Sequence, residues 1–223
     1  MAARLRLTDR EAAKDLDTYL ARAQAVQDGG SVRVIASGRA LAVYVPVLEP
    51  AGLLDDSPTV LGLRVFAIAE QAEPIDVVVP SAQLRTRVTE AMAEGFELGM
   101  PTPVYAMTWA GVVPPRGDWQ PVGEVSAEVL RAAAVEGIAE VTRTMPTNAG
   151  APVARRVRNQ VWRVSLPEDE RLTRGVALAA YTLGFLPPSG DELASIHAVG
   201  HWTRLTLRRG HVLARHRAWS LAG

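Results

Sequence analysis

The sequence contains no cysteine and almost no lysine. Without cysteine, thiolate catalysis, thiolate metal sites and disulfides are all excluded, although the cellular compartment is not fixed by this. Lys14 is the only lysine, against 23 arginines, and it falls on the polar face of a predicted surface helix. Nothing there would activate it as a nucleophile, so lysine-based chemistry is not expected. We attribute the arginine excess to coding bias, because it extends to positions that need no bidentate contact.

Long apolar runs are also missing. No segment approaches the ~18 apolar residues that a membrane span requires, and charged residues interrupt the first ten positions, where a signal peptide would need an apolar core. Hydrophobic residues make up 48% of the 223 and charged residues 22%, as in an ordinary globular protein that builds its own core. We therefore expect a cytoplasmic protein that makes no membrane contact.

The first hundred residues predict an α+β pattern of one helix, four strands and a second helix. Thr8 and Glu11 are spaced as a capping box, and Gly29-Gly30 supplies a stop for the helix that follows. Val- and Ile-rich stretches with turn residues between them predict the strands. The expected elements are a helix over 9–27, strands over 31–36, 40–47, 59–69 and 75–79, with a tight connection at Ser37-Gly38-Arg39, and a helix from Ser81 to Gly95.

The second half predicts one strand, three helices and a three-stranded β-meander. The apolar spacing favours a strand over 104–113, helices over 126–143, 153–164 and 174–185, and strands over 193–199, 202–207 and 212–215. We place the boundary near Gly99-Met100-Pro101, which gives subdomains of residues 1–100 and 104–223. Two subdomains that share one sheet would fit the same pattern.

Charge is segregated along the chain, although the formal net charge is zero. Residues 1–111 hold 10 bases and 14 acids, a net of −4, and residues 112–223 hold 14 bases and 10 acids, a net of +4. The last 24 residues contain no acid, five arginines and three of the four histidines. Such a segment is suited to contact an anion or an acidic partner.

Motifs that would indicate catalysis are missing. There is no phosphate-binding loop, no dinucleotide-binding glycine pattern, no Gly-x-Ser-x-Gly elbow and no His-Glu-x-x-His helix. The four histidines could bind zinc only if they shared one face, and the predicted turns between them oppose that. We therefore expect no metal and no cofactor, and we favour a binding or regulatory protein over an enzyme.

The leading hypothesis is a basic C-terminal surface that contacts nucleic acid or an acidic protein. Its residues come from an arginine-rich helix and from the meander, and they act together only if those two elements adjoin. Trp202 could form a stacking platform with the arginines, but we favour its packing in the core. The proposed contact residues are Arg155, Arg156, Arg158, Trp202, Arg204, Arg208 and Arg209.

Two other hypotheses stay open. The first is a small-molecule-binding protein or enzyme, with a pocket between the N-terminal sheet and the helices edged by Asp55, Asp56, Tyr105 and Trp109. Loop aspartates such as these two more commonly form a turn than take part in catalysis. The second is a homo-oligomer in which edge strands pair between copies.

Overall fold

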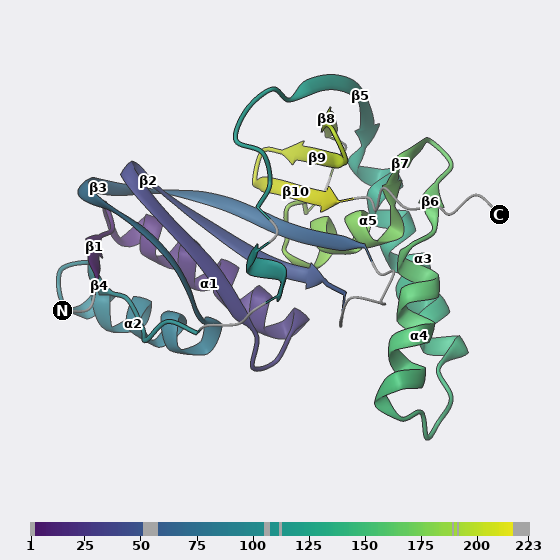
Figure 1. Ribbon diagram of the computed structural model, residues 1–223, viewed down its shortest axis with the longest axis horizontal. Coiled ribbons are helices and arrows are strands. Elements are labelled where there is room, and N and C mark those ends of the chain that lie inside the picture. The colour runs from purple at the N-terminus through teal and green to yellow at the C-terminus, as the bar shows by residue number, and fades with distance from the viewer. Residues whose placement is uncertain are drawn as a thin grey trace. The chain divides into compact units, whose positions relative to one another are not determined.

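The computed structural model describes residues 3–50, 58–104, 108–111, 113–188, 190 and 192–215 (Figure 1). The chain packs as two compact units. Met1–Val47 and Leu63–Val113 form the N-terminal unit, and Leu48–Gly62 and Pro114–Gly223 form the C-terminal unit. The described residues contain five α-helices and antiparallel sheets, which confirms the α+β prediction. The subdomain boundary that we place near Gly99-Met100-Pro101 stays a prediction.

The N-terminal unit pairs two helices with two long strands. Its elements are β1 (Arg4–Arg6), α1 (Arg10–Val26), most of β2 (Ser31–Leu48) and β3 (Thr59–Pro80), α2 (Ser81–Ala93), β4 (Glu97–Gly99) and the 3-10 helix η1 (Thr108–Gly111). β1 and β4 pair as a small antiparallel sheet that the sequence did not predict. Helices α1 and α2 pack against each other.

Helix α1 begins one residue later than the capping box predicts. Asp9 is the N-cap, and its carboxylate accepts hydrogen bonds from the backbone N–H of Glu11 and of Ala12, both at 2.9 Å. The Thr8 hydroxyl instead donates to the carbonyl of Ala67. An aspartate at this position also complements the helix dipole, so it outcompetes the neighbouring threonine as a cap.

The predicted breaks in the N-terminal strands lie inside β2 and β3, which are each continuous in their bounds: β2 includes Ser37-Gly38-Arg39, and β3 joins the predicted strands 59–69 and 75–79. In Figure 1 the ribbon of each of these two elements doubles back on itself. Gly38 has a φ of 57°, a backbone conformation that favours glycine, and residues 37–40 are exposed. The predicted tight connection therefore lies within β2 rather than between two separate strands.

The strand predicted over 104–113 is also wrong within the described residues, because Thr108–Gly111 form a 3-10 helix. Alternating large residues suggested a strand, but Pro103 and Pro114 flank the segment and cannot donate to a sheet ladder. Trp109 is buried in this turn, with 3% of its surface exposed. Arg33 donates to the carbonyl of Ala110 at 3.0 Å and holds the turn in place.

The C-terminal unit combines three helices with an antiparallel sheet. Its helices are α3 (Ala127–Thr144), α4 (Ala151–Trp162) and α5 (Arg174–Thr182), and β6 (Ser165–Leu166) with β7 (Asp169–Thr173) forms a short hairpin. The sheet has the order β10-β9-β8-β5, and β3, whose residues 59–62 belong to this unit, lies next to β10. These strands are β5 (Gln120–Ser126), β8 (Leu193–Val199), β9 (Trp202–Leu207) and β10 (Gly210–Arg215).

The predicted meander is confirmed as β8, β9 and β10, with β10 beginning two residues early. One face of this sheet packs on the helices, because α5 contacts β10 and Gly210 leaves room for the ring of Phe185. Helix α4 is held on α3 in a similar way: a side chain at Gly137 would collide with the ring of Trp162. The close approach of a ring to a glycine fixes the position of each element.

Candidate anion-binding surfaces

Helix α4 carries a cluster of exposed arginines. Val157, Val161 and Trp162 are buried and hold one face of the helix against the unit, although Val153, predicted to share that face, is 47% exposed. Three exposed arginines occupy other positions around the helix, and Ala151–Trp162 contain no acid. No hydrogen bond or ion pair to the described residues involves the side chains of Arg155, Arg156 and Arg158. We call these three residues the α4 arginine cluster.

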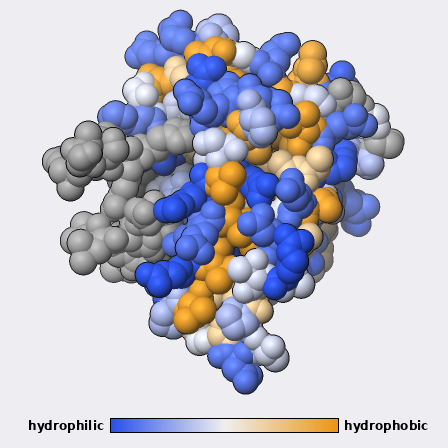
Figure 2. Space-filling view, turned by 90° about the vertical axis from the view of Figure 1, so that its right-hand side faces the viewer, coloured by the Kyte–Doolittle hydropathy of each residue, from blue (hydrophilic) through white to orange (hydrophobic). Residues whose placement is uncertain are grey.

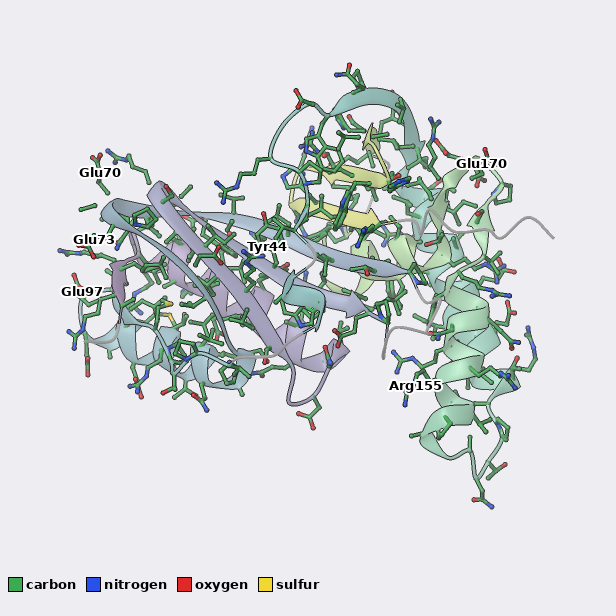
Figure 3. The ribbon with its side chains drawn as sticks, viewed as in Figure 1. Tyr44, Glu70, Glu73, Glu97, Arg155 and Glu170 are labelled. Atoms are coloured by element: carbon green, nitrogen blue, oxygen red, sulfur yellow. The ribbon has the colours of Figure 1, made fainter. Side chains whose placement is uncertain are left out.

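The surroundings of this cluster are open. Figure 3 shows Arg155 projecting outward from α4. In the side view of Figure 2, hydrophilic residues stand around a narrow apolar stripe. Exposed apolar side chains of α3 and α4 include Val135, Ile138 and Val153. A ligand at the arginines would therefore meet both charge and some apolar surface.

The arginines of the β9–β10 turn lie away from this cluster. Figure 1 shows α4 at one end of the C-terminal unit and the β8–β9–β10 meander at the other. Arg208 and Arg209 are exposed in the turn between β9 and β10. The structure therefore does not bring the residues of the predicted basic surface together; it separates them into two groups on one unit.

The side chains of strand β9 alternate between the two faces of the sheet, but the face that holds Trp202 and Arg204 is not an exposed platform. Trp202 is buried, at 8% exposure, as the core-packing alternative expects. Arg204 and Thr206, on the same face of the strand, are half-buried. Trp202 and Arg204 therefore do not form an open stacking surface for bases.

Arg204 instead stacks on a different tryptophan. Its guanidinium carbon lies 4.7 Å from the centroid of the Trp119 ring, within cation–π range. The Trp119 indole N–H donates to the carbonyl of Pro115 at 3.1 Å, which fixes the ring. Nε of Arg204 is buried without a hydrogen-bond partner in the described part of the chain. Burial lowers the pKa of Arg204.

Two histidines adjoin Arg204 in the sheet. His197 of β8 is its cross-strand partner, and Nδ1 of His197 is buried and unpartnered among the described residues. His211 of β10 pairs with Thr206, and its Nδ1 lies 3.1 Å from the Thr206 hydroxyl oxygen. Burial first, then the charges of Arg204 and His197, lower the pKa of His211. We call Arg204, His197, His211, Thr206 and Trp119 the β9 polar cluster.

A groove of about 680 Å³ lies beside the β9 polar cluster. Ser195, Thr206 and Arg208 line it, together with Glu192 and Leu193. The Glu192 carboxylate accepts from the backbone N–H of Arg208 at 2.8 Å and thereby holds the start of the β9–β10 turn. Because Thr206 belongs to both the groove and the cluster, the two are continuous.

Most of the alternative pocket falls outside the described residues. Asp55, Asp56 and Tyr105 are among the undescribed positions, and Trp109 is buried. That pocket stays a prediction. Within the described ranges, no three His, Asp or Glu side chains are grouped to hold a metal ion, and His216 lies beyond those ranges.

The β9 polar cluster could have been anticipated in part. Two-residue turns between Val199 and Trp202 and between Leu207 and Gly210 set the register, and that register places His197 and Leu213 beside Arg204. The role of Trp119 carried no such signal, because it precedes β5, a strand that the sequence did not predict.

Two family models match the sequence. Residues 1–111 match a domain of unknown function, DUF8010, and residues 114–219 match a second domain of unknown function, DUF8185. No curated protein matches the sequence. Among the described residues, no helix combines the length and the apolar character needed to span a bilayer.

Solved structures reveal the fold. The chain is similar to DNA polymerase III subunit beta from Borrelia burgdorferi in complex with a natural product, at a TM-score of 0.52 and 5% identity, over 93% of this chain and 64% of that one. It is also similar to the DnaN sliding clamp from Bartonella birtlesii bound to griselimycin, at a TM-score of 0.52 and 11% identity, over 98% of this chain and 66% of that one.

The chain has a sliding-clamp-like α+β fold. It spans about two thirds of the length of these two proteins. At such low identities the likeness shows the fold alone, because one fold hosts many functions.

Proposed function

We propose that this chain is a binding protein rather than an enzyme, and that it contacts nucleic acid through the α4 arginine cluster. The observation that carries the proposal is the set of three exposed arginines on one acid-free helix, none of them paired with a described carboxylate. Arginines neutralise phosphates and release counterions, which supplies sequence-independent affinity for nucleic acid.

The distribution of charge supports a contact at the C-terminal unit. The N-terminal unit exposes Glu70, Glu73 and Glu97 (Figure 3), and these carboxylates would repel a polyanion. Nucleic acid is favoured over an acidic protein face because the fold is shared with a subunit of a DNA polymerase.

The test compares two triple variants in titrations of labelled duplex DNA and single-stranded RNA at low salt. R155A/R156A/R158A removes the cluster. R6A/R10A/R39A is the control, because it removes the same charge from exposed positions of the N-terminal unit. We expect the first variant to bind at least about tenfold more weakly and the second to bind nearly as tightly as the wild type.

Two results would remove the proposal. One is a wild-type chain that binds neither nucleic acid at low salt. The other is an equal loss of affinity in both triple variants, because it would assign the effect to net charge rather than to α4.

A further inference from the structure

The β9 polar cluster carries an unpaired cation in a partly buried place. Arg204 has a buried Nε without a hydrogen-bond partner among the described residues, and its guanidinium makes no ion pair with a described carboxylate. Buried charges in proteins are normally paired, because desolvation without compensation is costly. The stack on Trp119 compensates only in part, since a cation–π contact does not satisfy the N–H groups.

The neighbours of Arg204 also favour an anion. His197 is its cross-strand partner on β8, and His211 of β10 lies diagonally from it, opposite Thr206. The Nδ1 of His197 is a second buried polar atom without a described partner. Two acids lie on this side of the sheet: Glu192 lines the groove and accepts from the Arg208 backbone N–H, and Glu124 of β5 is exposed and pairs in register with Ser195. Histidines on both neighbouring strands therefore lie near Arg204, and neither of these carboxylates forms an ion pair with it.

We propose that the β9 polar cluster is a binding site for an oxyanion, and that the adjoining groove receives the rest of a small ligand that carries this group. A phosphate or a carboxylate would accept hydrogen bonds from the guanidinium of Arg204 and from the imidazoles. The Thr206 hydroxyl and Ser195 lie further along the groove, where they offer polar contacts beyond the anion. A volume of about 680 Å³ is within the range of small-ligand sites.

This site is independent of the proposed nucleic-acid contact. Strand β9, which holds Arg204, and helix α4 lie at opposite ends of the C-terminal unit (Figure 1). Burying Arg204 without an anionic partner costs desolvation free energy, and hydrogen bonds to a bound anion would offset that cost. Such residues typically cost stability in the free protein in exchange for binding.

The experiment uses inorganic phosphate as its probe, with acetate in a second arm. The full chain is titrated by calorimetry in a phosphate-free buffer, and the imidazole resonances of His197 and His211 are followed by NMR. We expect phosphate to bind and to raise the pKa of His211, because a bound anion favours the imidazolium. Tighter binding of phosphate than of acetate would identify a phosphate-bearing ligand, and the reverse order would identify a carboxylate.

Variants locate the site. R204M keeps the aliphatic stem but removes the charge, and it should weaken anion binding by about tenfold or more while the melting temperature of the free protein stays the same or rises. R209M, an exposed arginine of the same hairpin, is the matched control and should bind as the wild type does. H211N is a second variant of the β9 polar cluster and should also weaken anion binding.

The proposal is overturned if neither anion binds, or if R204M binds as tightly as R209M. Its failure is separable from that of the proposed function. The R155A/R156A/R158A variant should retain anion binding, and R204M should retain binding to nucleic acid.

Discussion

At the scale of single residues, the C-terminal unit buries two polar atoms, Nε of Arg204 and Nδ1 of His197, that have no hydrogen-bond partner among the described residues. Arg204 stacks on Trp119 and lies beside His197, with no ion pair to a described carboxylate. The sequence predicted that Arg204 belongs to a charged face of a meander, and the structure places it on that strand. Its burial and its tryptophan partner could not be predicted, because both depend on the chain segment before β5.

His211 should make stability depend on pH. Its pKa is lowered from the ordinary 6.5 by burial, by Arg204 of β9 and by His197 of β8, so the folded chain favours the neutral ring. Below about pH 6.5 the unfolded chain binds a proton at this position before the folded chain does. The free energy of unfolding should therefore fall as the pH falls through this window.

Urea denaturation between about pH 7.5 and about pH 5.5, in a phosphate-free buffer, measures this effect. H211N should flatten the dependence, whereas H201N, at an exposed turn position, should leave it as in the wild type. An unchanged slope in H211N would show that another group controls it.

At the scale of elements, periodicity predicted the helices and the meander to within a few residues. α1, α3, α4 and α5 form within a few residues of the expected ranges, although Ile138 and Val153 are exposed rather than buried, and β8 and β9 have the expected bounds. The misses have physical causes. β5 contains Pro121, Gly123 and a bulge, so it lacks the alternation of a regular strand, and the 3-10 turn at Trp109 mimics that alternation over too few residues.

Helix α5 depends on α3 through a charged contact. Arg174, with 16% of its side chain exposed, pairs with Glu136 at 3.0 Å and also with Glu140. R174M should lower the free energy of unfolding by about 1–3 kcal/mol, because it leaves the partly buried Glu140 without its partner.

Chemical denaturation of R174M beside R87M checks this expectation. Arg87 forms an exposed pair with Glu90 within α2, and its loss should cost no more than about 0.5 kcal/mol. Equal effects in the two variants would show that the α3–α5 contact adds nothing beyond a surface ion pair.

At the scale of the whole molecule, contacts in space do not follow the order of the sequence. Leu48–Gly62 belong to the C-terminal unit although the chain on both sides of them belongs to the N-terminal unit. The packing of Leu48 near Gly175 illustrates this, since a Cβ at that glycine would meet the Leu48 side chain at 2.5 Å. No sequence pattern predicts that Leu48–Gly62 belong to the C-terminal unit, because glycine and proline indicate only local breaks in helices and strands.

Leu61 should therefore stabilise the C-terminal unit. It is 1% exposed, and L61A should lower the stability of that unit by about 2–5 kcal/mol. Hydrogen exchange read by mass spectrometry should show faster exchange in peptides of residues 127–215. L41A, equally buried in the N-terminal unit, should speed exchange in residues 10–47 instead. The opposite pattern would contradict the division into units.

The salt dependence of DNA binding tests the central claim most directly. If the α4 arginine cluster neutralises three phosphates, the plot of log affinity against log salt for R155A/R156A/R158A should be shallower than that of the wild type by about 2.7, at about 0.9 per phosphate. The R6A/R10A/R39A control should keep the wild-type slope. An α4 variant with the wild-type slope and affinity would contradict the proposal that this helix contacts nucleic acid.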